Sequence, residues 1–340
     1  MNEQGGEPFE AADRWTYVLV TPDGVVSGAL DHVLELLRDN GFTVVVSRAH
    51  QLDVPTMISV YDKPPPPPGT PERKSGGIQI PARMFDNLYR AGPACLLVLH
   101  RSGGSASEIM TRCKGYTRPE AAQPRTVRHL GENVILNLVH SPDDQANAWR
   151  ELCVLVGEPE AERLRAAALR PGGGATLIGL RSLPDSMPAT SGWEAISFPV
   201  TANRLRRRVV QLMTLRADPD ALDLLHRAWT LLDKERDALA TRTTSLDRMR
   251  AAQPLTGPIH DLLTTVVGEV DDPALLRGLT ALHAFYRLDG DRDIAAVLSL
   301  ANHGVFVSAL EKMVLESHAT SFRPHEDLER AYGASAGLPS

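Results

Sequence analysis

Short apolar runs alternate with amphipathic stretches along the first part of the chain, which is typical of strands and helices packed in layers. Apolar runs of strand length cover residues 15–20, 42–46 and 95–100. Between the first two runs, apolar positions recur at helical spacing after Ser27, a suitable N-cap, and stop at Gly41, where a helix end favours glycine. The pattern therefore predicts a strand, a helix and a second strand in succession, with a third strand further along.

Further segments complete the prediction for this part of the chain. The pattern predicts a helix over 56–61, and another that starts at Asp143 and continues to about residue 155. An insert over 64–77 begins with consecutive prolines, which cannot donate backbone hydrogen bonds and favour an extended surface segment. Residues 133–139 are almost continuously apolar, so we expect a strand that is buried on both faces.

The pattern changes past residue 157. Consecutive glycines at 172–174 and a high content of Pro, Ser and Gly after them indicate a boundary zone over 158–202. Within this zone, short strands are expected at 176–179 and 195–200. We therefore expect a first domain over residues 1–157, followed by a connecting zone.

Residues 203–335 have apolar positions at helical spacing almost throughout. The pairs Asp218-Pro219 and Asp272-Pro273 each place a capping side chain before a proline, so each is expected to start a helix. We predict an all-α C-terminal domain, whose sequence names no ligand.

The charge balance bears on the class of partner. The chain has 340 residues with 36 Lys and Arg against 42 Asp and Glu, which gives a net charge of −6. This mildly acidic balance argues against nucleic acid or an anionic membrane as the main partner. A local basic cluster remains, for which we favour a solvated helix face or an acidic partner helix over nucleic acid. Its members are Arg204, Arg206, Arg207 and Arg208.

Cysteine usage and apolar run lengths bear on the compartment. The three cysteines, Cys95, Cys113 and Cys153, are too few and wrongly spaced for a disulfide framework or a cysteine-rich zinc site. No apolar run approaches the roughly 20 residues of a membrane span, and the first residues are polar and acidic, unlike a secretory leader. We expect a cytoplasmic protein that does not enter membranes.

An ordered set of short motifs runs through the first domain. In chain order they are Thr21-Pro22-Asp23-Gly24-Val25, Gly41-Phe42, Tyr61, Ala91-Gly92-Pro93, then Gly115, Thr117, Pro119, Thr126 and Arg128, and finally Asn137, His140, Asp143 and Glu151. In this order and over residues 15–157, the chain resembles the nucleoside diphosphate kinase family. The resemblance implies a ferredoxin-like α/β (α+β) fold, with an antiparallel sheet covered by helices, joined here to the all-α domain.

The resemblance also implies a chemistry for three residues. His140 is the nucleophile that takes the γ-phosphoryl of ATP or another NTP and passes it to an NDP, because a neutral imidazole can hold the group without a separate base. Glu151 orients the imidazole in one tautomer, and Tyr61 helps to position the phosphoryl group. Mg²⁺ arrives on the nucleotide phosphates, so no metal ligands are expected in the protein itself.

Contacts to the nucleotide phosphates and ribose are implied for a second set of residues. These are Thr21, Arg112, Thr117, Arg128 and Asn137. Thr21 stands where the family has a lysine that contacts the transferred phosphate, and its lack of charge should slow transfer. One phosphate-binding arginine aligns with Thr111, beside Arg112, and Pro142 replaces a serine whose hydroxyl could relay a hydrogen bond.

These departures leave alternatives to the kinase. The domain could have kept a nucleotide pocket but lost efficient transfer, and so act as a sensing or scaffold module coupled to the helical domain. Transfer to a small acceptor that is not a nucleotide is a further alternative. The family commonly forms hexamers or tetramers, so a homo-oligomer is one expectation, while the helical domain could block or replace those interfaces.

Overall fold

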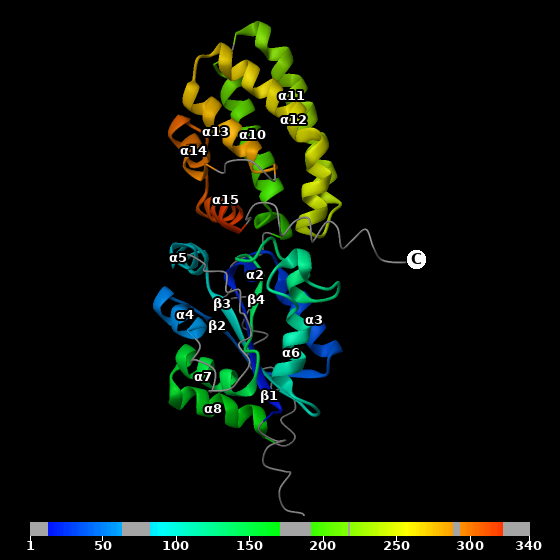
Figure 1. The fold of residues 1–340 in the computed structure, drawn as a ribbon, viewed down its shortest axis with the longest axis vertical. Coiled ribbons are helices and arrows are strands. Elements are labelled where there is room, and N and C mark those ends of the chain that lie inside the picture. The colour runs from blue at the N-terminus through cyan, green and yellow to red at the C-terminus, as the bar shows by residue number, and fades with distance from the viewer. Residues whose placement is uncertain (1–12, 63–81, 171–191, 217, 288–292, 322–340) are drawn as a thin grey trace, which may run out of the picture. The chain divides into compact units, whose positions relative to one another are not determined.

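The computed structural model describes residues 13–62, 82–170, 192–216, 218–287 and 293–321 (Figure 1). The chain divides into two compact units. The first comprises Met1–Tyr116, Gln123–Arg128 and Leu138–Thr190, and the second comprises Thr117–Ala122, His129–Asn137 and Ser191–Ser340. The insert expected over 64–77, the glycines at 172–174 and the strand expected at 176–179 lie outside the described residues.

The first unit is built on a four-stranded sheet in the order β2-β3-β1-β4, in which every neighbouring pair is antiparallel. The strands are β1 (Trp15–Val20), β2 (Phe42–His50), β3 (Ala94–Arg101) and β4 (Val139–His140). The inner strand β1 is buried along its whole length, as its apolar run predicts. This sheet confirms the expected ferredoxin-like antiparallel architecture.

Helices cover both faces of the sheet. α3 (Ala29–Asp39) and α6 (Ala106–Lys114) lie on one side, and α7 (Gln145–Val156) and α8 (Glu158–Leu169) lie on the other (Figure 1). Successive side chains of β1 alternate between these layers. Thr16 Oγ1 accepts a hydrogen bond from Ser107 of α6 at 3.0 Å, whereas the next residue, Tyr17, donates to Glu151 of α7 at 2.7 Å.

Short helices complete this unit. They are α2 (Pro22–Val26), α4 (Val54–Tyr61) and α5 (Ala82–Arg90), and the 3-10 turn η2 (Val127–Leu130) begins in this unit. The helix expected over 56–61 is thus confirmed, and Asp53 caps it by accepting from the N–H of Thr56. α2 occupies the expected Pro-Gly turn, and Gly24 is required there because a Cβ would overlap the carbonyl oxygen of Leu138.

The strand expected over 133–139 is wrong except for its last residue. Asn133 Oδ1 accepts the backbone N–H groups of Ile135 and Leu136 at 2.9 and 3.0 Å, which closes a local turn. Leu138 has a φ of 76°, in the left-handed region that a strand does not use. Apolar side chains in this segment are buried as predicted, but an asparagine side chain competes with sheet pairing for the backbone donors.

The strand expected over 195–200 is also wrong. Trp193–Ala195 forms the 3-10 turn η3, and α10 begins at Phe198 with Pro199 in its first turn. Proline lacks the N–H that a strand ladder needs but fits the start of a helix. Within the zone expected to connect the domains, residues 158–169 form the helix α8.

The second unit is helical in its described parts. Its helices are α10 (Phe198–Thr214), α11 (Leu222–Ala240), α12 (Ser245–Glu269), α13 (Pro273–Ala284), α14 (Ile294–Ser299) and α15 (Ala309–Ser321). Short 3-10 turns occur at η1 (Pro119–Ala121), η3, η4 (Pro219–Ala221) and η5 (Leu300–His303). The expected start at Asp272-Pro273 is confirmed, since Asp272 accepts from the N–H of Leu275. None of the described helices is long and apolar enough to cross a membrane.

The basic cluster of α10 pairs with an acidic helix. Arg206 is buried and lies 3.0 Å from Glu235, and Arg207 lies 2.6 Å from Asp233, with both acids on α11. The acidic partner helix, one of the two interpretations favoured from the sequence, is therefore what these two arginines meet. Both ion pairs therefore connect α10 to α11 within the second unit.

Candidate active site

A buried pair joins the end of β4 to α7. His140 lies opposite Leu19 of β1 and is 7% exposed, and its Nε2 lies 2.8 Å from Oε2 of the fully buried Glu151. An ionised carboxylate can only accept, so Nε2 carries the hydrogen and Nδ1 keeps its lone pair. The sequence predicted this pairing, and the geometry leaves one nitrogen of His140 as a nucleophile.

Glu151 is held from several directions. Tyr17 donates its hydroxyl hydrogen to Oε2 at 2.7 Å, and Arg150 Nη2 lies 3.2 Å from Oε1. Arg150 also donates to the carbonyl oxygens of Ser59 and Val60 at the end of α4. Burial alone would raise the pKa of Glu151, but the hydrogen bonds from His140 and Tyr17 and the nearby charges hold that pKa below its ordinary value. The carboxylate is therefore ionised where the histidine needs it.

Sequence reasoning missed Tyr17. Its signal is a hydroxyl in the mostly apolar strand β1, on the face that meets α7. Tyr17 supplies a hydroxyl to Glu151 from the sheet, although Pro142 has removed the hydroxyl expected beside the histidine.

We expect Tyr17→Phe to lower the free energy of unfolding by about 2 kcal/mol, because it removes a buried hydrogen bond to a charged group. Urea unfolding measures this loss. Tyr116→Phe is the matched control, since Tyr116 is 62% exposed and should lose almost nothing. Equal unfolding midpoints for the two variants would show that the Tyr17 hydroxyl does not hold Glu151.

The pKa of His140 is lowered from its ordinary value. Burial is the largest cause, and the positive charges of Lys114 and Arg128 act in the same direction. The hydrogen bond to Glu151 and the charge of that carboxylate oppose them. The imidazole is consequently neutral around pH 7, which is the state that a nucleophile requires.

Tyr61 and Arg128 border the histidine. Tyr61, at the end of α4, meets His140 edge-on, with ring centroids 5.1 Å apart at 72°, and is 42% exposed. Arg128 is buried, and its Nη2 donates to the carbonyl oxygen of Val139, the residue before His140, at 3.1 Å. The structure thus places these two residues beside His140, where the sequence predicted them.

A second cation contacts the segment that follows His140. Lys114, the last residue of α6, donates from Nζ to the carbonyl oxygen of Ser141 at 2.6 Å and to Asp143 Oδ1 at 2.9 Å. Sequence reasoning missed this residue as well. Its only signal is that it stands four positions after Met110, so that it shares the buried face of α6.

Thr21 and its neighbours tie the end of β1 to the histidine segment. Thr21 is buried, and its N–H donates to the carbonyl oxygen of Leu138 at 3.0 Å. Asp23 Oδ2 accepts from the N–H of Leu138 at 2.9 Å. Burial raises the pKa of Asp23, against the hydrogen bonds from Thr21 and Leu138. Thr21 therefore lies beside the chain that leads to His140, as the family spacing predicts.

The other residues expected to contact the nucleotide are divided between the two units. Arg112 is exposed on α6, and in the described residues it forms no hydrogen bond or ion pair. Thr117 and Asn137 belong to the second unit, where Asn137 Nδ2 donates to the carbonyl oxygen of Thr117 at 3.4 Å. In that unit, Glu132 accepts from the N–H of Phe198 at 2.8 Å and Asn133 donates to Ser317 at 3.1 Å. The segment that ends at Asn137 is thus anchored to α10 and α15.

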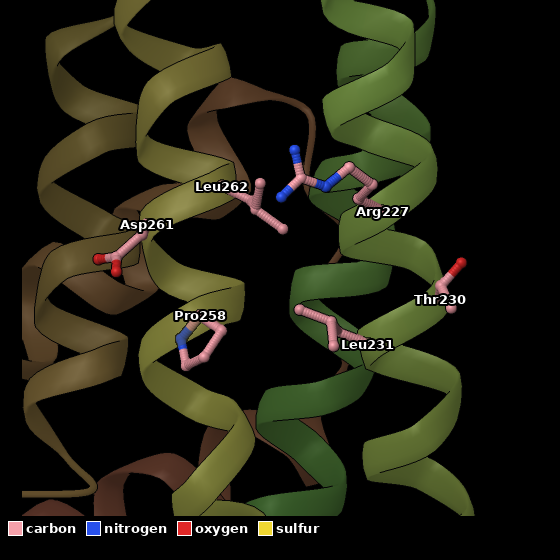
Figure 2. Close-up of a pocket in the computed structure, with 6 residues that line it drawn as sticks. All are labelled: Arg227, Thr230, Leu231, Pro258, Asp261 and Leu262. Atoms are coloured by element: carbon pink, nitrogen blue, oxygen red, sulfur yellow. The ribbon is translucent and has the colours of Figure 1, made fainter.

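A separate cavity of about 440 Å³ lies between α11 and α12 of the second unit (Figure 2). Its lining residues are Arg227, Thr230, Leu231, Pro258, Asp261 and Leu262. None of the residues named for the phosphoryl chemistry lines it. Across the described parts of both units, no group of three His, Cys, Asp or Glu side chains is placed to hold a metal ion.

Comparison with known proteins identifies the first unit. A nucleoside diphosphate kinase of Streptococcus pneumoniae (strain P1031) is 30% identical over 145 residues, which cover 41% of this chain and 96% of the relative. The chain belongs to the nucleoside diphosphate kinase family. A nucleoside diphosphate kinase of Methanoregula boonei is 28% identical over 138 residues, or 40% of this chain and 83% of the relative.

No family model matches the chain. Among solved structures, the nucleoside diphosphate kinase of Encephalitozoon cuniculi is 19% identical, covers 42% of this chain and 89% of its own, and gives a TM-score of 0.35. The kinase-like part accounts for less than half of the residues, and the remainder of the chain matches neither of these relatives. His140 and Glu151, the buried pair described above, lie in the kinase-like part.

Proposed function

We propose that the first unit is a nucleoside diphosphate kinase-like phosphotransferase that moves the γ-phosphoryl of an NTP to an NDP through a phosphohistidine on His140. The observation that carries the proposal is the 2.8 Å contact between His140 Nε2 and Glu151 Oε2, which leaves Nδ1 as the nucleophile. Membership of the family supports the nucleotide as the substrate class.

In the first half-reaction, the Nδ1 lone pair forms a bond to the γ-phosphorus while the bond to the β–γ bridging oxygen breaks. The NDP leaves with that electron pair, and the proton on Nε2 stays in place. The phosphorylated ring gains positive charge, which the carboxylate of Glu151 stabilises through the Nε2–H. In the second half-reaction, a terminal oxygen of a different NDP attacks the same phosphorus and the N–P bond breaks, so the ring returns to its neutral state.

The surrounding groups position the phosphoryl group and supply positive charge beside it. Transfer passes through a loose transition state with charge on the equatorial oxygens, so cations beside the phosphorus lower the barrier. Arg128 is the cation nearest the histidine among the residues that the family motifs assign. Tyr61 would position the phosphoryl group at the open side of the site, and Mg²⁺ would enter on the nucleotide phosphates as part of the substrate. Thr21, Arg112, Thr117 and Asn137 complete the proposed nucleotide contacts.

A second candidate function is a nucleotide-sensing or scaffold module. The observation that favours it is Thr21, which has no charge where the family has a lysine. Incubating the purified chain with ATP, Mg²⁺ and GDP separates the two candidates. The kinase forms GTP and ADP in equal amounts at a rate proportional to protein concentration, whereas a sensing module binds the nucleotides and forms no GTP.

A further inference from the structure

Lys114 is a buried cation that contacts the segment following His140. Its side chain is 6% exposed, and Nζ donates to the carbonyl oxygen of Ser141 and to Asp143 Oδ1. A lysine is rarely buried, because removing its ammonium from water costs several kcal/mol unless partners replace the lost hydration. Here those partners are both within three residues of the proposed nucleophile, so ordering Lys114 also orders that segment.

The charge of Lys114 acts on the same groups as the charge of Arg128. Burial lowers the pKa of Lys114, and Arg128 lowers it further, while Asp143 and Glu151 raise it. Both cations lower the pKa of His140. The geometry agrees, since Nζ of Lys114 lies 2.6 Å from the carbonyl oxygen of Ser141, the residue that follows His140.

The groups that face His140 come from five elements. They are Tyr17 of β1, Tyr61 of α4, Lys114 of α6, Arg128 of η2 and Glu151 of α7, and Asp143 follows on the same loop. Of these, only the two cations favour the neutral imidazole by charge. Since Arg128 also fixes Val139, the histidine is bracketed by a cation on the residue before it and another on the residue after it.

We propose that Lys114 is a positioning residue for His140: its ammonium fixes residues 141–143 and supplies the site with positive charge that the end of β1 lacks at Thr21. The proposal rests on phosphoryl transfer through His140. It adds a residue that the family motifs do not contain, because Lys114 lies outside the matched positions. It also gives a physical reason why a site with Thr21 can still transfer a phosphoryl group.

The first test does not depend on activity. NMR titration of the His140 ring in the full chain is compared between wild type, Lys114→Met, Lys114→Arg and the control Lys234→Met, whose lysine is exposed on α11. Removing the nearby charge raises the pKa of His140 in Lys114→Met by about 0.5–1, while Lys114→Arg and Lys234→Met stay at the wild-type value. Lys114→Gln, which keeps hydrogen-bond donors but no charge, gives the same rise if the methionine variant does not fold.

The second test uses phosphoenzyme formation. Lys114→Met lowers its rate by about 10- to 100-fold, and the acid limb of the pH–rate profile moves to higher pH because more of the imidazole is protonated. Lys234→Met keeps the wild-type rate, because Lys234 is exposed on α11 and lies outside the site. Thr21→Lys in the Lys114→Met background restores at least about a tenth of the lost rate.

An unchanged titration of His140 in both Lys114→Met and Lys114→Gln would overturn the inference, as would a wild-type rate in those variants. Failure of the proposed function looks different. The wild type then forms no phosphohistidine. The NMR titration of His140 still reports separately whether the charge of Lys114 acts on the imidazole.

Discussion

His140→Ala abolishes transfer of label from γ-labelled ATP to the protein. The variant removes the nitrogen that we propose as the nucleophile, because Nδ1 of His140 keeps its lone pair while Nε2 is hydrogen-bonded to Glu151. Alanine offers no group that can form a bond to phosphorus, so we expect a loss of more than about 1,000-fold. Autoradiography after alkaline gel electrophoresis measures the labelled fraction.

His226→Ala is the matched control for this prediction. His226 is exposed on α11 of the second unit, so its removal should leave labelling at the wild-type level. If His140→Ala takes up label as fast as wild type while remaining folded, the phosphoryl group resides elsewhere and His140 is not the nucleophile.

Glu151→Gln should lower the rate of phosphoenzyme formation by about 100-fold. The amide keeps the size of the side chain but loses the charge that stabilises the phosphorylated ring, and its NH₂ group donates hydrogen bonds where the carboxylate only accepts them. Because Glu151 is fully buried and bonded to His140 and Tyr17, we expect the apparent affinity for ATP to change little. Rapid-quench kinetics over a range of ATP concentrations separates the two quantities.

The same substitution should also shift the pH dependence of the rate. Glu151 raises the pKa of His140, so the neutral variant should lower that pKa and move the acid limb of the pH–rate profile to lower pH. Glu158→Gln, at the exposed start of α8, is the control and should behave as wild type. A wild-type rate in Glu151→Gln would mean that the carboxylate does not hold the histidine in its reactive tautomer.

The core of the site was predictable because it depends on short motifs at fixed spacings. The apolar run of β1 defined an inner strand, and His140, Glu151, Tyr61 and Arg128 meet where the family order places them. Tyr61 and Glu151 stand on helices that the apolar pattern indicated, whereas the family motifs alone placed His140 and Arg128.

The loop before His140 was not predictable from apolar content alone. Residues 133–139 are buried, which the pattern predicted, but burial does not distinguish a strand from a compact loop. The side chain of Asn133 takes the backbone donors of Ile135 and Leu136, and this local competition decides the outcome. An asparagine at the head of an apolar run is a signal for such a turn.

Tyr17 and Lys114 were missed because their roles arise only from tertiary contacts. A tyrosine in an apolar strand and a lysine at a helix end are ordinary in sequence. Their significance comes from the partners that α7 and the loop after β4 bring to them, namely Glu151, Ser141 and Asp143. The same reasoning explains why Thr117 and Asn137 could not be assigned to the second unit, since that assignment depends on contacts with distant helices.

The most direct measurement is the intact mass of the purified chain after mixing with ATP and Mg²⁺, followed by a chase with nucleoside diphosphates. The account predicts a mass increase of one phosphoryl group that is labile in acid, is absent from His140→Ala, and disappears during the chase as the matching triphosphate forms. The absence of any adduct in protein that demonstrably binds nucleotide would contradict it and favour the sensing module.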